Sequence, residues 1–181
     1  MTDINKGKLI IIEGADGTGK TTQVSLLIEY LEKQQICFKL YDFPQYESFY
    51  GLLIAAYLRG ELGELKNVSP YVSALLFASD RSVVAHQMQK DLDDGLLLIA
   101  NRYVTSNMAH QGGRFGNDNE RNAFFTWLET LEYDQNHMPR EDAVVLLDMP
   151  ANTAAKLVDT KDPREYLQGK QKDIQESDEN H

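Results

Sequence analysis

The stretch Gly14-Ala15-Asp16-Gly17-Thr18-Gly19-Lys20-Thr21-Thr22 decides the fold of this 181-residue chain. Its spacing of a glycine, four free positions, a glycine, a lysine and a hydroxyl residue is that of a phosphate-binding loop. The apolar run 9–12 before it predicts a buried strand, and the segment 23–35 after it carries apolar residues at helical spacing. Strand, loop and helix in this order are the context that the motif needs. A glycine-rich turn without a ligand is the competing interpretation.

The residue types in this loop suit a polyphosphate. Glycines let the backbone turn tightly and point its N–H groups inward, and a helix that begins near Lys20 adds its positive N-terminal end. Lys20 would reach the β- and γ-phosphates, and the Thr21 hydroxyl would complete the shell of a magnesium ion. The predicted polyphosphate site consists of Gly14, Gly17, Thr18, Gly19, Lys20, Thr21 and Thr22.

Asp16 is the unusual member of the loop, because a carboxylate is unfavourable where anions bind. We therefore expect its side chain to point away from the phosphates toward a neutral donor on a second ligand. The alternative is a turn residue that accepts hydrogen bonds from local backbone N–H groups.

Composition excludes several classes of protein. The 18 basic and 28 acidic residues give a formal charge of −10, which argues against binding to nucleic acid or to an anionic membrane. The single cysteine, Cys37, rules out an intramolecular disulfide, and its apolar surroundings predict a buried, inert thiol. The chain starts without an apolar signal region, and no apolar run approaches the roughly 18 residues of a membrane span. We expect one cytoplasmic domain over residues 1–181.

Apolar runs predict four strands, at 9–12, 36–41, 96–100 and 143–147. Helices are expected near 20–35, 50–59, 69–93 and 119–133, where caps or glycine stops bound the segments. Strands that are apolar throughout and alternate with helices imply a parallel sheet covered on both faces. The predicted fold class is α/β, a three-layer sandwich around a parallel sheet.

Several side chains outside the loop could bind a second ligand. Phe77 and Arg81 are four residues apart, so they could present a flat ring beside a fork of donors, although a core phenylalanine beside a surface arginine in an ion pair fits equally. Arg102 directly follows the third strand, at the edge of the sheet where ligands of open α/β folds bind, and suits a phosphate. Asn107 and Gln111 offer amides that could read a base edge or could simply be solvated.

Basic residues gather late in this acidic chain. Lys161, Arg164, Lys170 and Lys172 either form a solvated face or belong to a lid, at about 160–175, that closes over a transferring phosphoryl group.

With these residues in view, the chain resembles the thymidylate kinases, a family of phosphate-loop nucleoside monophosphate kinases. Four motifs recur in family order and spacing over nearly the whole chain. They are Glu13 to Thr22, Phe43-Pro44, Leu76 to Arg81, and Arg102 to Asn107.

The resemblance implies a phosphotransferase that passes the γ-phosphoryl group of ATP to dTMP with magnesium, yielding dTDP for nucleotide biosynthesis. It also implies a homodimer formed through apolar helices on one flank. By the same resemblance Lys20, Arg102 and Asp16 act in catalysis, with Asp16 on the sugar 3′-hydroxyl and Arg102 on the acceptor phosphate. The remaining implied contacts are Phe77 stacked on thymine, Arg81 and Asn107 at the base edge, Gln111 bordering the same pocket, and Phe43 and Tyr46 lining the cleft.

Two departures from the family keep other functions open. Family members often carry aspartate where this chain has Asn101, which retains an oxygen but loses the charge that would organise magnesium. The chain also stops where the family continues with a helix, a fifth strand and a final helix, so we expect a truncated product. The alternatives are a deoxynucleoside kinase and a catalytically weak nucleotide-binding protein.

Overall fold

The computed structural model describes residues 6–150, 153–154, 157, 165–167 and 173–175, and every structural statement below concerns these residues. A four-stranded sheet with the order β2-β3-β1-β4 lies at the centre, and all its pairs are parallel. The strands are β1 (Lys8–Gly14), β2 (Phe38–Asp42), β3 (Leu97–Asn101) and β4 (Ala143–Leu147). The predicted α/β class is confirmed.

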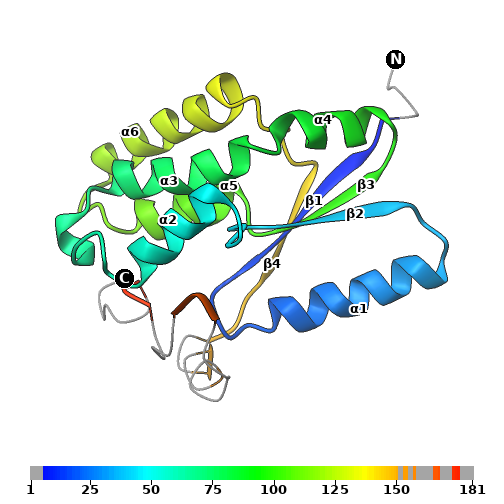
Figure 1. The fold of residues 1–181 in the computed structure, drawn as a ribbon, viewed down its shortest axis with the longest axis horizontal. Coiled ribbons are helices and arrows are strands. Elements are labelled where there is room, and N and C mark those ends of the chain that lie inside the picture. Colours follow the sequence, from blue (N-terminus) through cyan, green and yellow to red (C-terminus); the bar gives the residue numbers. More distant parts are fainter. Residues whose placement is uncertain (1–5, 151–152, 155–156, 158–164, 168–172, 176–181) are drawn as a thin grey trace.

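Helices form the outer layers (Figure 1). The α-helices are α1 (Lys20–Lys33), α2 (Phe49–Leu58), α3 (Pro70–Ser82), α4 (Ala85–Asp93), α5 (Val104–Gly112) and α6 (Asp118–Glu129). Short 3₁₀ turns occur at η1 (Leu65–Asn67) and η3 (Glu165–Leu167), and α6 continues into a π-helical turn, η2 (Thr130–Gln135). One face of the sheet carries α1 and the other carries α4 and α5, while α2, α3 and α6 pack outward from α5.

The alternation of side chains along β1 divides the interior into two cores. Leu9 and Ile11 point to the face covered by α4 and pack with Met88, and all three side chains are fully buried. Ile12 points to the opposite face and packs with Val24 of α1. A continuous apolar run therefore serves both faces, as expected for a strand inside a parallel sheet.

The helix predicted over 69–93 is two helices in the structure. The chain leaves helical geometry at Val84, which has φ −105° and ψ 1°. Two adjacent β-branched residues, Val83 and Val84, lower helix propensity at this point. The break lets α4 lie on the sheet while α3 packs against α2 and α5.

Two predictions of burial are wrong. Cys37 is exposed because it lies just before β2, at the amino end of that strand and outside the packed part of the sheet. On β4, Val144, Val145 and Leu146 are 42%, 45% and 67% exposed. Within the described residues β4 is an edge strand that pairs only with β1. The sequence pattern implied that both faces of this strand are covered, but its side chains are partly exposed.

The segment expected to form a lid falls mostly outside the described residues, and Lys161, Arg164, Lys170 and Lys172 are all among those not described. Its described parts lie beside α2. The Ile174 N–H donates to the Leu58 carbonyl at 2.9 Å, and the Arg59 guanidinium donates to the Tyr166 carbonyl at 2.8 Å. No helix in the described part of the chain is both long enough and apolar enough to cross a membrane.

A polar cluster ties β2 to α4. The Asp91 carboxylate is buried and accepts hydrogen bonds from the Tyr41 hydroxyl at 2.6 Å, the Lys39 ammonium at 2.7 Å and the Gln87 amide at 2.8 Å. Burial would raise the pKa of Asp91, but these three donors outweigh that effect and hold it below its ordinary value.

We predict that Asp91→Asn lowers the free energy of unfolding by about 1–3 kcal/mol at pH 7. The pKa of Asp91 in the folded protein lies below its unfolded value of roughly 4. The ionised carboxylate therefore stabilises the protein above pH ~4, and this stabilisation is lost as the pH falls through the folded pKa. Urea denaturation of the parent and the variant at several pH values measures this difference, which should shrink in acid. Asp93→Asn, at an exposed position of the same helix, is the control. A difference that is independent of pH would contradict this role.

Candidate active site

The loop between β1 and α1 has the geometry of an anion cradle. Gly17 adopts φ +86°, and a Cβ at that position would lie 2.3 Å from the Ala154 carbonyl oxygen, so only glycine fits. The Lys20 ammonium donates to the carbonyl oxygens of Gly14 at 2.8 Å and Ala15 at 2.9 Å. Its charge thus sits over the loop, at the N-terminus of α1.

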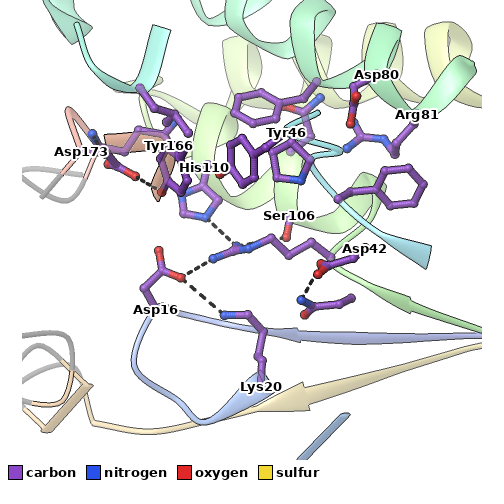
Figure 2. A pocket seen from close by; sticks show the side chains of 18 of the residues that line it. Asp16, Lys20, Asp42, Tyr46, Asp80, Arg81, Ser106, His110, Tyr166 and Asp173 are labelled. Carbon is purple, nitrogen blue, oxygen red and sulfur yellow. Dashed lines mark hydrogen bonds and ion pairs between the residues drawn. The ribbon is translucent and has the colours of Figure 1, made fainter. Parts of the chain in front are cut away.

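A second cation faces this loop from the end of β3. Arg102 adopts φ +62°. Residues other than glycine rarely take this backbone conformation, and those that do are often found at functional sites. Its Nη2 donates to Asp16 Oδ1 at 2.5 Å, and the same carboxylate lies 3.7 Å from Lys20 Nζ (Figure 2). The neutral donor expected for Asp16 belongs to a second ligand, and that contact stays a prediction. In this structure the partners of Asp16 include the two cations Arg102 and Lys20.

Glu13, for which the sequence indicated no role, joins the two halves of the site. Its carboxylate is 6% exposed and accepts hydrogen bonds from the Ser106 hydroxyl at 2.6 Å, the Thr105 hydroxyl at 2.7 Å and the Tyr103 N–H at 3.1 Å. These donors belong to the first turn of α5, where a negative charge is favourable. An acidic residue at the end of an apolar strand, directly before the loop, was the available signal.

Aromatic rings form one wall of the cavity. Phe43 is buried, and Tyr46 stacks on Tyr166 with ring centroids 4.1 Å apart and an angle of 10° between the planes. Phe77 is half-buried and packs edge-on against Tyr57 at 6.3 Å. Phe43, Tyr46 and Phe77 all line the cavity that the phosphate-binding loop also borders.

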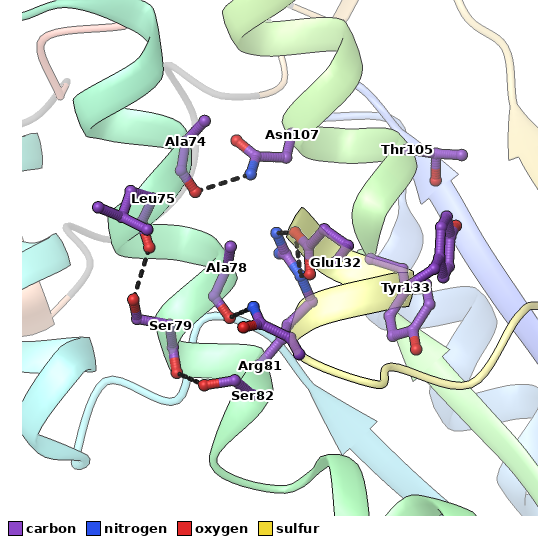
Figure 3. A network of polar contacts seen from close by, with 12 residues as sticks. Ala74, Leu75, Ala78, Ser79, Arg81, Ser82, Thr105, Asn107, Glu132 and Tyr133 are labelled. Atoms are coloured by element: carbon purple, nitrogen blue, oxygen red, sulfur yellow. Dashed lines mark hydrogen bonds and ion pairs between the residues drawn. The ribbon is translucent and has the colours of Figure 1, made fainter. Parts of the chain in front are cut away.

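Arg81 is held by a carboxylate that no sequence pattern indicated. Its Nε donates to Glu132 Oε1 at 3.1 Å, and its Nη2 also donates to Glu132 (Figure 3). The two side chains are 3% and 0% exposed. Glu132 reaches Arg81 from the π-helical turn η2, a distortion that often occurs at functional sites. Arg81 is ion-paired, as one interpretation of the sequence expected, but it is buried and does not lie on the surface. It also lines the cavity, and its contact with a ligand stays a prediction.

Two buried amides from α5 present one unpaired polar atom each. The Asn107 Nδ2 group donates to the Ala74 carbonyl at 3.0 Å, which leaves Oδ1 without a partner among the described residues. The Gln111 Oε1 atom accepts from Ser73 Oγ at 2.7 Å and Arg114 Nη1 at 3.1 Å, which leaves Nε2 likewise unpaired. An unpaired buried polar group costs about 1–3 kcal/mol, so both atoms indicate a ligand.

The fold therefore gathers most of the predicted site around one cavity. All the residues predicted to bind the second substrate line it: Asp16, Phe43, Tyr46, Phe77, Arg81, Arg102, Asn107 and Gln111. From the loop, Gly17, Gly19, Lys20 and Thr21 line it, whereas Gly14, Thr18 and Thr22 do not. Asp42 and Asn101, at the carboxyl ends of β2 and β3, also line it. The chemical roles of these residues stay predictions.

We predict that Glu132→Ala lowers the free energy of unfolding by about 3–5 kcal/mol, because it leaves the buried charge of Arg81 unpaired. Arg81→Ala should cost a similar amount by leaving Glu132 unpaired, so that substitution alone does not isolate a role in binding. Urea denaturation measures both. Glu129→Ala, at an exposed position of α6, is the control. The double variant Arg81→Met/Glu132→Leu should recover most of the loss, and a double variant no more stable than either single variant would contradict the pairing.

Comparison with known proteins points to one family. A family model described as thymidylate kinase matches residues 12–180 of this chain. The probable thymidylate kinase of Pyrococcus abyssi is 31% identical over 152 residues, which cover 83% of this chain and 69% of that protein. The thymidylate kinase of Mycobacterium tuberculosis is 34% identical over 149 residues, covering 82% of this chain and 69% of that protein.

A solved structure shows the same similarity. The thymidylate kinase of Candida albicans matches with a TM-score of 0.66 and 28% sequence identity, and the match covers 83% of this chain and 67% of that chain. This chain thus spans about two thirds of the length of the proteins to which it is compared.

Proposed function

This chain belongs to the thymidylate kinase family, and on that premise we propose that it transfers the γ-phosphoryl group of ATP to dTMP, giving ADP and dTDP. An oxygen of the dTMP phosphate attacks the γ-phosphorus, and the bond from that phosphorus to the β–γ bridging oxygen breaks. A phosphate monoester has a second pKa of about 6, so the acceptor is mostly ionised at pH 7 and needs no strong base. Catalysis then rests on positioning and charge neutralisation.

The observation that carries this proposal is the hydrogen-bonding pattern of the buried amides and Arg81. Along α3, Gln111 is held at Ser73, Asn107 at Ala74, and Arg81 follows seven residues after Ala74, two turns further along the helix. All three side chains line the same cavity, and we propose that the acceptor Asn107 Oδ1 lies between the Gln111 and Arg81 donors when a base is bound. Such a series complements an edge with a carbonyl, an N–H and a second carbonyl, which thymine presents at O4, N3 and O2.

Cytosine would not fit this series. It presents an amino donor at position 4 and an acceptor at N3, so it would set donor against donor at one end and acceptor against acceptor in the middle. Uracil presents the same edge as thymine and lacks only one methyl group, which a pocket distinguishes by about 1–3 kcal/mol. We therefore propose dTMP as the preferred substrate and dUMP as a slower one.

We assign the phosphate chemistry to the two cations that face the loop. Lys20 would neutralise the β- and γ-phosphates of ATP, and Arg102 would hold the acceptor phosphate. In this structure Asp16 lies between them, within hydrogen-bonding distance of Arg102. The carboxylate offsets part of their combined positive charge, and in the proposed complex it accepts a hydrogen bond from the 3′-hydroxyl of the sugar.

The residues beside the loop also fit magnesium, which takes oxygen ligands and keeps several waters. Thr21, Asp42 and Asn101 line the cavity, and Asn101 Oδ1 is buried without a partner among the described residues. Asp42 supplies a carboxylate one strand away from Asn101, whose Nδ2 donates to it at 2.8 Å. The ion would neutralise charge on the phosphates when it is bound.

We also propose that each chain is one kinase domain and that two copies form a homodimer in the cytoplasm. Large apolar side chains on α2 and α3 are exposed, among them Phe49 at 72%, Leu52 at 61% and Leu75 at 46%. Burying them against a second copy would remove a sizeable apolar patch from water. Sedimentation equilibrium of the protein used for the assays below tests this assembly.

One observation favours the deoxynucleoside kinase alternative. A kinase of that class acts on a hydroxyl and needs a carboxylate base beside it. Asp42 is a carboxylate in the same cavity, whereas Glu13 is already occupied by three donors. The nature of the acceptor, a phosphate or a hydroxyl, distinguishes the two functions.

A coupled assay with ATP, magnesium and a panel of acceptors tests the proposed function. We expect turnover of dTMP, slower turnover of dUMP, at least a hundredfold lower kcat/KM for dCMP because of the mispaired edge, and none of thymidine. Turnover of thymidine but not of dTMP would replace the proposal by a deoxynucleoside kinase. Binding of dTMP without turnover would favour the catalytically weak nucleotide-binding protein.

Asn101→Asp tests the proposed metal site. The substitution sets a second carboxylate against Asp42, so we expect the melting temperature in EDTA to fall by a few degrees, corresponding to about 1–2 kcal/mol. Saturating magnesium should restore it, and the magnesium concentration for half-maximal turnover should fall. Thermal melting with and without magnesium measures this, with the double variant Asp42→Asn/Asn101→Asp as the control that returns to one carboxylate. A loss of stability that magnesium does not reverse would place the ion elsewhere.

A further inference from the structure

We propose that Arg114 is a positioning residue: it fixes which end of the Gln111 amide faces the cavity, and so makes that side chain a donor to a carbonyl oxygen of the bound base. The inference rests on the proposed function, because it names the group that sets one position of the base-reading series. Arg114 does not line the cavity itself and acts through Gln111.

Arg114 is held in place by backbone. Its Nη2 donates to the carbonyl of Leu65 at 2.6 Å and also to the carbonyl of Val68, both in the segment around η1. Its Nη1 donates to Gln111 Oε1 at 3.1 Å and to Ser73 Oγ at 3.2 Å. One guanidinium thus connects the η1 segment, the start of α3 and the end of α5.

Ser73 alone could not fix the Gln111 amide. A hydroxyl can donate or accept, and Ser73 Oγ also lies 3.3 Å from the Ser69 carbonyl oxygen and 3.2 Å from that of Pro70. It could turn its proton to either carbonyl and accept from a flipped amide. A guanidinium carries donors only, so Arg114 requires an acceptor, Oε1, on its side of the amide.

This constraint determines what the cavity offers. Gln111 is fully buried and lines the cavity, and with Oε1 bound to Arg114 its Nε2 group has no partner among the described residues. A carbonyl oxygen of the base satisfies that donor. If the amide flipped, an acceptor would meet that oxygen, and the complex would lose a hydrogen bond and gain a repulsion.

A double-mutant cycle on dTMP binding tests the proposal, because it separates action through Gln111 from a general loosening of the structure. We expect Arg114→Met to raise the Kd for dTMP about tenfold, which corresponds to roughly 1.4 kcal/mol. In a Gln111→Met background the same substitution should change Kd by less than about twofold. Isothermal titration calorimetry measures the four constants, and thermal melts record the stability of each variant.

Two further variants keep the test decisive if Arg114→Met loosens the η1 segment. Arg114→Lys retains a group with donors only and should bind dTMP within about threefold of the parent. Val68→Ala loosens the same segment without removing the donor and should leave Kd within about twofold. An equal effect of Arg114→Met in both Gln111 backgrounds, or equal losses for Arg114→Lys and Arg114→Met, would overturn the inference.

Binding and turnover separate this inference from the proposed function. If the parent binds dTMP without turning it over, the kinase assignment fails, and the cycle still decides the role of Arg114. If the parent does not bind dTMP at all, the substrate assignment and the role of Arg114 fail together.

Discussion

The Glu13 carboxylate is the contact on which the rest of the site depends. Glu13 is the next-to-last residue of β1, directly before the phosphate-binding loop, and its carboxylate accepts three hydrogen bonds from the N-cap and first turn of α5. That turn follows Arg102, and the same helix carries Asn107 and Gln111. One buried charge, satisfied by dipoles and hydroxyls, therefore sets the distance between the groups that face a phosphate and those that face a base.

Because buried polar groups normally have hydrogen-bond partners, the unpaired polar atoms of the cavity indicate which donors and acceptors a ligand would need. Asn107 and Gln111 each use one end of the amide inside the protein, and the partners fix which end that is. A carbonyl can only accept and a guanidinium can only donate, so the orientation of each amide follows from its partner. The atoms left over, Asn107 Oδ1 and Gln111 Nε2, are one acceptor and one donor without a partner among the described residues.

The buried cations of the cavity also have partners inside the protein. The chain carries a formal charge of −10, yet the cavity contains Lys20, Arg81 and Arg102. Each arginine is held by a carboxylate, Glu132 for Arg81 and Asp16 for Arg102, because an unpaired buried charge would cost several kcal/mol. The two pairs differ in exposure. The Arg81 pair is closed off from water, which suits a fixed part of the pocket, whereas the Arg102 pair is partly exposed, at 18% and 27%, and is accessible to an anion.

The sequence by itself determined the loop, the four strands and the α/β class. Glycine spacing and apolar runs are local patterns, and they favour a given backbone conformation whatever packs around them. It also placed Phe77, Arg81, Arg102, Asn107 and Gln111 among the candidates, since helical spacing and strand ends predict which side chains share a face or an edge. The tertiary structure alone decided the partners. Glu132 lies 51 residues from Arg81 in the sequence. Arg114, which binds Gln111, is itself held by carbonyl groups that lie more than 40 residues before it. It also decided the break between α3 and α4 and the exposure of Cys37 and β4, because burial depends on which elements pack over a residue, and no local pattern encodes that.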